Sequence, residues 1–449
     1  MKKNLLLLFI LVGFVSNAQN VFWQERSTGF LTTSTNETVI SYADANTVWI
    51  YATAGDGSGD YYQQWGRSLD GGDTWTNGPI DLGNVDLVIG DICAVSATTA
   101  YIVTWANASG LTGGVYVTND AGVTWQKQAS ASYNTGTDSF PDVIYFWDAN
   151  KGVTVGDPAS GYFEIYTTTN AGANWVRVPE ANIPASLPGE YGYTGNREVR
   201  DNIIWFTTNK GRIYKSTDYG LNWTVSQSPI SDFGSAAVNG SIAYKDENNG
   251  LLITNTLQFF RTTDGATWNE EFPVGYYRDF EIAYVPGTAN TYVCTGTDPD
   301  GIGRGSSYST DGGANWVDIN GFDVTPNDGA NSLSFYDPTH GLSGGFTTDA
   351  VTAGIWKWVN DASTLAATSF SNDKAFTAFI NISTGMLEVN GKNITNVTVF
   401  DVLGKQVSNN NFTSVDNASI NASNFNNGIY LVKVTNNAGA ASTIKVVKN

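Results

Sequence analysis

A motif of Ser or Thr, Asp, Gly and Trp recurs six times along this chain and constrains its fold more than any other feature. Five copies have the spacing Ser/Thr-x-Asp/Asn-x-Gly-x-x-Trp, and the fifth copy in order is one residue shorter. Successive tryptophans are 50, 50, 48, 45 and 48 residues apart, so one structural unit is repeated. The defining residues are Asp70 and Trp75, Asp120 and Trp125, Asn170 and Trp175, Asp218 and Trp223, Asp264 and Trp268, and Asp311 and Trp316.

Each position of this motif has a physical role in a tight turn. The Asp carboxylate can accept hydrogen bonds from the backbone N–H groups of its own turn. The Gly can take a positive φ, the hydroxyl can bond another backbone group, and the Trp can begin the next strand and pack its ring. The six copies resemble Asp-boxes, and we call them box turns. We interpret them as hairpin stabilisers rather than as ligand contacts.

Each repeat contains four short strands, and the box turn lies between the third and the fourth. In the third repeat these strands are residues 143–147, 152–155, 163–167 and 175–178. A repeat near 48 residues that holds four short strands predicts a β-propeller, so the fold class is all-β. We predict seven blades, with six or eight as alternatives.

The seventh blade is predicted from the end of the repeat region, where no box turn occurs. Residues 332–335, 341–346 and 354–358 supply three strands, and residues 21–25 can supply the fourth. Pairing the two ends closes the ring and removes exposed strand edges.

The composition narrows the classes of function. The formal net charge is −19, which argues against nucleic-acid binding and against anionic membrane surfaces. Cys93 and Cys294 fall in the second and sixth repeats, too far apart for a disulfide, so we predict two buried free thiols. His340 is the one histidine, which we interpret as a structural turn residue. We expect no metal site and no cofactor.

The N-terminus has the three parts of a secretory signal. Lys2 and Lys3 precede an apolar run at 5–15, and a small-residue cleavage site ends at Ala18. We predict a signal peptide at 1–18, a propeller at 19–360, a linker at 361–375 and a final domain at 376–449. No other stretch approaches the ~20 apolar residues of a membrane helix.

The final domain has strands of a small β-sandwich. Its residues 399–405 (VFDVLGK), 425–434 (FNNGIYLVKV) and 443–448 (TIKVVK) resemble, in order, the motifs of the type A C-terminal sorting domain of the type IX secretion system. The Pro-Asn-Pro stretch that usually opens that domain is absent at 379–383. The resemblance implies export through the periplasm and across the outer membrane, with release or surface attachment. It also implies the type IX machinery as a partner.

The propeller resembles the group related to the photosystem II stability and assembly factor. This resemblance rests on residues 145–152 (YFWDANKG) and 242–250 (IAYKDENNG). Both segments have the same order of features: a strand, an Asp, a turn and a Gly. The resemblance implies an assembly or binding role, so we expect non-catalytic binding of a glycan or a surface protein at the central opening. The candidate binding residues, all expected at the surface, are Asp142, Glu190, Tyr191, Tyr193, Arg197, Arg200, Tyr277, Arg278 and Asp279.

A glycoside hydrolase is the alternative, because sialidases and xyloglucan-cleaving enzymes also carry Asp-boxes. The sialidase Phe-Arg-Ile-Pro signature does not occur here, and no arginine trio is recognisable by motif. General glycoside hydrolysis needs only a facing pair of carboxylates, and the chain has 42 acidic residues. Such a pair in the central channel stays open as an alternative.

Overall fold

The structure is a computed structural model. It describes residues 22–30, 32, 34–56, 58–133, 140–234, 237–296, 305–319, 332–349, 352–365, 376–381, 384–401, 405–437 and 441–448. The predicted signal peptide lies outside the described residues, and so does most of the predicted linker. The chain divides into two compact units, residues 1–367 and 368–449.

The first unit consists almost entirely of short antiparallel strands, as the box-turn repeat predicts. Its elements are β1 (Trp23–Ser27), β2 (Thr35–Tyr42), β3 (Val48–Ala54), β4 (Tyr61–Ser68), β5 (Thr76–Pro79), β6 (Leu87–Ala94), β7 (Ala100–Ala106), β8 (Gly114–Thr118), β9 (Gln126–Lys127), β10 (Pro141–Phe146), β11 (Gly152–Ala159), β12 (Tyr162–Thr168), β13 (Val176–Arg177), η1 (Glu180–Asn182), β14 (Gly192–Arg200), β15 (Ile203–Thr208), β16 (Arg212–Ser216), β17 (Thr224–Gln227), β18 (Gly240–Tyr244), β19 (Gly250–Thr254), β20 (Phe259–Thr262), β21 (Asn269–Glu271), β22 (Glu281–Tyr284), β23 (Tyr292–Gly296), β24 (Gly305–Ser309), β25 (Val317–Asp318), β26 (Ser332–Asp337), β27 (His340–Asp349), β28 (Thr352–Trp358) and η2 (Ala362–Thr364).

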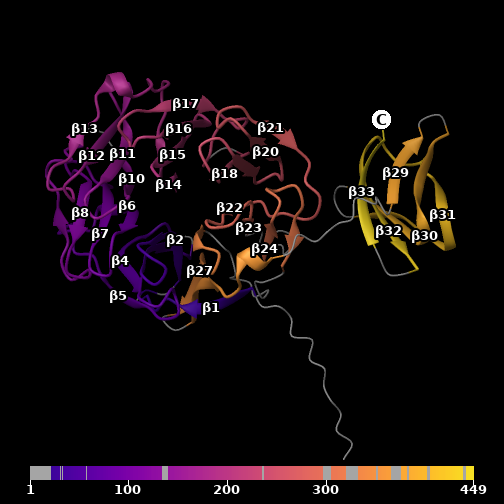
Figure 1. Ribbon diagram of the computed structural model, residues 1–449, viewed down its shortest axis with the longest axis horizontal. Coiled ribbons are helices and arrows are strands. Elements are labelled where there is room, and N and C mark those ends of the chain that lie inside the picture. The colour runs from indigo at the N-terminus through magenta and orange to yellow at the C-terminus, as the bar shows by residue number, and fades with distance from the viewer. Residues whose placement is uncertain are drawn as a thin grey trace, which may run out of the picture. The chain divides into compact units, whose positions relative to one another are not determined.

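These strands form sheets that follow one another around a ring (Figure 1). Within the described residues, five sheets have four strands each, in the orders β6 to β9, β10 to β13, β14 to β17, β18 to β21 and β22 to β25. One further sheet has eight strands, because β2–β5 and the group β26, β27, β28 and β1 are joined where Asn36 pairs with Phe346. The all-β propeller is therefore confirmed. The predicted seven blades require that joined sheet to count as two, and the blade count stays a prediction.

The N-terminal strand closes the ring, as predicted. Strand β1 pairs antiparallel with β28, and Trp23 lies opposite Trp358. The two indole rings are 5.0 Å apart in an edge-to-face arrangement, and Trp23 Nε1 donates to Ser306 Oγ at 2.9 Å. The first strand of the folded chain thus completes the last sheet, which covers an edge that would otherwise invite strand addition.

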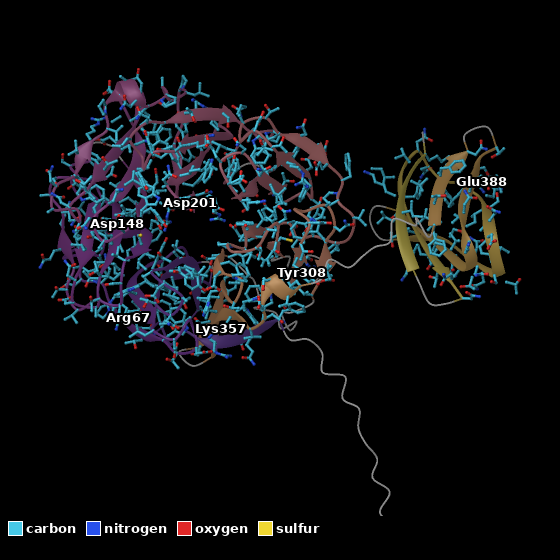
Figure 2. The ribbon with its side chains drawn as sticks, viewed as in Figure 1. Arg67, Asp148, Asp201, Tyr308, Lys357 and Glu388 are labelled. Atoms are coloured by element: carbon cyan, nitrogen blue, oxygen red, sulfur yellow. The ribbon has the colours of Figure 1, made fainter. Side chains whose placement is uncertain are left out.

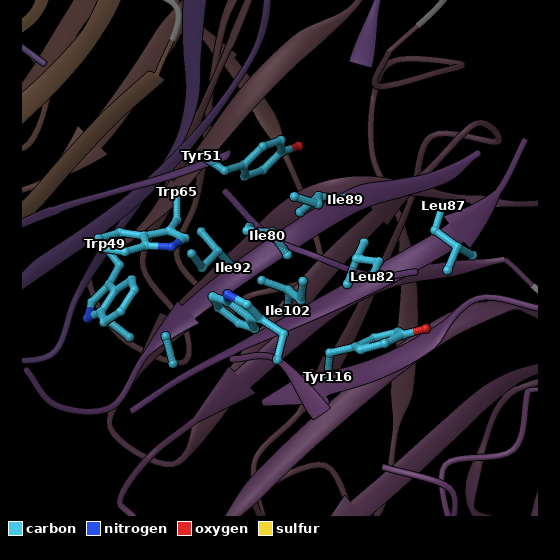
Figure 3. Packing of buried hydrophobic residues seen from close by; sticks show 13 residues of the cluster. Trp49, Tyr51, Trp65, Ile80, Leu82, Leu87, Ile89, Ile92, Ile102 and Tyr116 are labelled. Carbon is cyan, nitrogen blue, oxygen red and sulfur yellow. The ribbon is translucent and has the colours of Figure 1, made fainter. Parts of the chain in front are cut away.

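The core lies between neighbouring sheets. One cluster joins β3 and β4 to β6, β7 and β8, and Figure 3 shows its side chains. Trp49 is fully buried there, with the Trp65 ring 5.1 Å away and the Trp125 ring 6.4 Å away. A box-turn tryptophan is therefore part of the packing between two sheets, which ties the repeat motif to the stability of the ring.

The box turns have the hydrogen bonds that their sequence predicts. In the first, Asp70 Oδ1 accepts from the Thr74 N–H at 2.8 Å, and Ser68 Oγ accepts from the Gly72 N–H at 2.8 Å. Trp75 Nε1 donates to the Gly72 carbonyl at 3.1 Å. The same Asp/Asn and Ser/Thr bonds recur in the second, third, fourth and sixth copies.

The shorter fifth copy keeps part of this network. Asp264 Oδ1 accepts from the N–H groups of Ala266 and Thr267 at 2.9 and 2.7 Å. The Trp268 indole N–H is buried without a hydrogen-bond partner, whereas the Trp223 and Trp316 indoles donate to glycine carbonyls. The shorter copy therefore preserves the carboxylate bonds, and its unpartnered indole N–H is a feature shared with Trp125 of the full-length second copy.

Both cysteines are buried free thiols, as predicted. Cys93 lies in β6 and Cys294 in β23. Burial raises the pKa of Cys93 to about 11 and that of Cys294 to about 12, so both stay protonated at neutral pH. Each sulfur accepts a backbone N–H, from Phe146 and from Arg278 respectively.

The second unit is a small five-stranded antiparallel sheet with its own core. Its strands are β29 (Phe376–Asn381), β30 (Met386–Asp401), β31 (Gln406–Asn421), β32 (Gly428–Asn436) and β33 (Ala441–Lys448). The order is β29-β30-β32-β33, and β31 pairs with β30 along most of its length. Val389, Val397, Val399, Val432 and Val434 are fully buried.

Among the helices that the structure describes, none has the length and apolar composition to cross a bilayer.

Candidate functional site

A central cavity of about 1140 Å³ lies within the first unit. Seven strands contribute to its wall, and every sheet of this unit supplies at least one: β2, β6, β10, β14, β18, β22 and β26. We call this cavity the channel. Strand β14 contributes most, through the continuous run 194–200.

A large bulge in β14 explains why this strand contributes most to the channel wall. Between the pairs Gly192–Thr208 and Arg197–Phe206, β14 advances five residues while β15 advances two. Gly195 takes a φ of 69° in this bulge, and a Cβ there would lie 3.0 Å from Val39 of β2. The bulge therefore reaches across to strands of other sheets, and a tight turn without a side chain permits that approach.

Arg197 anchors the bulge to β6. Its Nη1 lies 2.6 Å from Asp91 Oδ1, and its Nη2 donates to the Ile92 carbonyl at 3.1 Å. Asp91 is fully buried, and its carboxylate also accepts the N–H groups of Ile92 and Ile144. Burial raises the pKa of Asp91 to about 6, and the adjacent guanidinium opposes that shift.

A second set of charged groups lies further along the channel. Arg200 Nη2 donates to Glu198 Oε1 at 2.6 Å, and that oxygen also accepts the Tyr244 N–H at 3.3 Å. Burial raises the pKa of Glu198. Both channel arginines are therefore already paired with carboxylates.

Glu281 of β22 faces Ser241 of β18. The Ser241 hydroxyl donates to Glu281 Oε2 at 2.7 Å. Burial raises the pKa of Glu281 to about 7, helped by repulsion from Glu198, so near neutral pH this carboxyl is partly protonated. The two residues occupy equivalent positions in the lines Ser-Ile-Ala-Tyr and Glu-Ile-Ala-Tyr at 241–244 and 281–284.

The charged lining is acidic on balance. Two arginines stand against four acidic residues: Asp148, Glu198, Asp201 and Glu281. Asp148 and Asp201 are labelled in Figure 2. Because the arginines are paired, the channel favours neutral or cationic ligands over anions.

Aromatic rings make up much of the remaining wall. The Tyr42 and Tyr336 rings lie 5.8 Å apart, and Tyr336 is 43% exposed. Phe280 is 40% exposed, and the Tyr42 hydroxyl is buried without a hydrogen-bond partner. Exposed rings beside carboxylates can hold aliphatic, aromatic or cationic side chains.

The predicted binding residues divide between the channel and other parts of the unit. Arg197 and Arg200 line the channel. Tyr191 is 39% exposed, and its ring lies 5.6 Å from that of Tyr193, whose hydroxyl donates to Asp232. Tyr277 donates to the Leu257 carbonyl at 2.6 Å, and its ring packs 5.3 Å from that of Phe259. Asp279 is half-buried.

Three of the predicted surface groups are buried, which corrects the expectation of exposure. Glu190 is 5% exposed and bonds Arg212 at 2.9 Å and Thr208 at 2.8 Å. Arg278 is 3% exposed and bonds Asp318 at 2.7 Å. A long loop in the sequence does not reveal that its charged residues find partners inside the unit, so pairing and burial were both missed.

Asp142 is the third buried group, at 2% exposure. It lies beside a register shift in β10 and hydrogen-bonds with Asp157. Burial and the neighbouring carboxylate raise the pKa of Asp142 well above its usual value, and burial raises that of Asp157 to about 7. The two carboxyls therefore share a proton near neutral pH.

Sequence reasoning missed Glu198, Ser241, Glu281 and Tyr336 of the channel. A polar residue at the start of an otherwise apolar first strand is the sequence signal that could have identified Ser241 and Glu281.

His340 lies in a turn at the start of β27, where its Nδ1 contacts Asp337 Oδ1 at 2.9 Å. The side chains that define the box turns do not line the channel.

Comparisons with known proteins agree with this architecture. Residues 84–236 match the family model of the photosynthesis system II assembly factor YCF48, and residues 377–449 match that of the secretion system C-terminal sorting domain. No curated protein matches the sequence. The sorting match indicates secretion or display at the cell surface.

Two similar solved structures are YCF48 propellers. One is described as YCF48 bound to D1 peptide, with 15% identity and a TM-score of 0.52 over 77% of this chain and 100% of that chain. The other is YCF48 from Cyanidioschyzon merolae, with 14% identity and a TM-score of 0.52 over 75% of this chain and 99% of that chain. The chain therefore combines a β-propeller, part of which matches the YCF48 family model, with a C-terminal domain that matches the model of the secretion system C-terminal sorting domain.

Proposed function

We propose that this protein is an exported binding module whose channel holds a segment of a surface protein, without catalysis. The observation that supports this proposal is a channel of about 1140 Å³ with an acidic and aromatic lining, in which both arginines are paired with carboxylates. Sites for small molecules usually span about 300–1,000 Å³. The larger volume suits a peptide segment better than a small metabolite.

The ligand of a similar propeller supports the proposal that this channel holds a peptide. One solved YCF48 structure is described as bound to a D1 peptide, so a propeller of this fold can take a peptide. The acidic lining of the present channel favours a segment that is neutral or carries Lys or Arg. The same charge disfavours sialylated glycans.

Calorimetry on the full mature chain tests this proposal. The probes are a peptide with two lysines around a tyrosine, the same peptide with glutamates for lysines, a neutral polysaccharide and a sialylated glycan. Saturable binding of the lysine peptide, at least about tenfold tighter than the glutamate peptide, supports the proposal. Binding of a glycan alone, or equal binding of both peptides, overturns it.

Matched variants locate the bound peptide. Tyr336→Ala removes an exposed ring of the channel and should weaken the lysine peptide roughly tenfold. Phe272→Ala removes a 76% exposed ring outside the channel and should leave binding unchanged. Equal effects of the two substitutions would move the peptide out of the channel.

A second candidate function is glycoside hydrolysis, and Glu198 and Glu281 favour it. A carboxyl held partly protonated beside an ion-paired carboxylate is the arrangement of a general acid and its partner. In that case a neutral polysaccharide would release reducing ends. Glu281→Gln would abolish the release while leaving binding of the polysaccharide intact.

A further inference from the structure

The sorting domain carries large apolar side chains on the face of its sheet that turns away from its core. Along β32, Tyr430, Val432 and Val434 are buried, while Ile429 and Leu431 between them are 39% and 40% exposed. Successive side chains of a strand point to opposite faces. The two exposed residues are therefore on the outer face by register, and the core on the other face is complete without them.

Strand pairing places further apolar residues beside Ile429 and Leu431 on the outer face of the sheet. Ile429 lies opposite Val447 of β33, which is 51% exposed, and Leu431 lies opposite Phe400 of β30, which is half-buried. Residues directly opposite in an antiparallel pair share one face. Phe400, Ile429, Leu431 and Val447 thus form one continuous group across three strands, which we call the outer apolar patch.

Positive charge borders this patch. Lys445 lies opposite Leu431, and the exposed Lys433 follows two residues later on the same face of β32. Residues 368–449 hold six lysines, no arginine and four acidic residues, a net charge of +2. With 23 basic and 42 acidic residues in the whole chain, the remaining residues carry −21. The sign of the charge therefore changes at the second unit.

We propose that the outer apolar patch is the surface through which the sorting domain docks on the secretion machinery. Its occupant is a protein surface with an apolar centre and an acidic rim, because the patch itself is apolar with a lysine border. Isolated exposed apolar residues are ordinary, but a continuous group on adjacent strands marks an interaction site. This inference rests on the sorting match and is independent of what the channel binds.

Export of the full chain from a host that has this secretion system tests the proposal. The double variant Ile429→Ser with Leu431→Ser should reduce exported protein by roughly tenfold or more, the effect of removing central contacts from an interface. The matched control is Phe379→Ser, which removes a 50% exposed ring of β29 whose cross-strand partner is Glu388. The control should be exported like the unchanged chain.

A second variant covers the case in which the double variant does not fold. Lys433→Glu keeps every apolar contact and reverses one border charge, so it should also reduce export. Thermal melting of the purified chains reports folding of each variant. Normal export of a folded double variant overturns the proposal, as does normal export of Lys433→Glu.

Sedimentation of the purified chain separates the machinery from a second copy as the occupant. We expect a monomer at micromolar concentration both with and without the double substitution. A dimer that the double substitution dissociates would assign the patch to self-association and overturn docking on the machinery.

Discussion

Arg197 and Asp91 form a buried ion pair at 2.6 Å although 106 residues separate them in the sequence. The arginine belongs to the bulge of β14, and the aspartate belongs to β6. Their bond fixes the segment that contributes most to the channel wall. The pair is therefore a positioning element for the candidate site as well as a structural contact between sheets.

Breaking this pair from one side should destabilise the propeller strongly. Arg197→Met leaves Asp91 buried without its guanidinium, which we expect to lower the free energy of unfolding by about 3–5 kcal/mol. Chemical denaturation measures the loss. Arg26→Met breaks an exposed pair with Asp73 and should cost about 1 kcal/mol or less. Similar losses in the two variants would contradict a buried role for Arg197.

The carboxyl pair of Asp142 and Asp157 should make stability depend on pH. Both pKa values are raised in the folded chain, that of Asp157 to about 7, against about 3.9 for an unfolded Asp. Between those values the folded chain binds more protons than the unfolded chain, so stability falls as pH rises. Melting temperatures from pH 5 to 8 measure this fall.

Asp142→Asn should flatten that dependence, because an amide can donate to Asp157 without charge repulsion. The variant should melt higher than the unchanged chain at pH 8 and show a smaller advantage at pH 5. Asp148→Asn is the control, since backbone hydrogen bonds from Asn150 and Lys151 lower the pKa of Asp148. A pH dependence unaltered by Asp142→Asn would exclude the pair as its source.

The box-turn tryptophans should contribute to stability according to their burial. Trp175 and Trp223 are 3% and 5% exposed, so replacing either with Ala should cost about 3–5 kcal/mol. Leu221 belongs to the same turn as Trp223 and is 50% exposed, so Leu221→Ala should have little effect. Urea unfolding distinguishes these outcomes, and near-zero losses at both tryptophans would contradict the assignment of the turns.

The residue after the Asp or Asn of each box turn lies in the left-handed region. Ala171 has a φ of 56° there, whereas Gly71 and Gly312 occupy the position in other copies. Ala171→Gly should therefore stabilise the chain by up to about 1 kcal/mol. In the same turn, Ala173 lies outside that region, so Ala173→Gly should be neutral or destabilising. A melting comparison of the two variants decides the point, and a loss of stability at position 171 would refute it.

The candidate site was predicted only in part, and particular residues explain why. Arg197 and Arg200 follow an aromatic loop, and both line the channel. Glu190 and Arg278 have the same polar character, but Arg212 and Asp318 bond them inside the unit. Local sequence cannot report a partner that is 22 or 40 residues away. Pairing decides between surface and interior for such groups.

The sequence by itself determined the local and repeating parts of this protein. Box turns and short strands follow from contacts within a few residues. Ring closure by β1 and two separate free thiols follow from the spacing of the motif along the chain. The tertiary structure alone decided the bulge of β14, the ion pair of Arg197 with Asp91, and the pairing of Glu281 with Ser241. These features join segments from different sheets, and the energy of burying a charge depends on a neighbour that only the closed ring supplies.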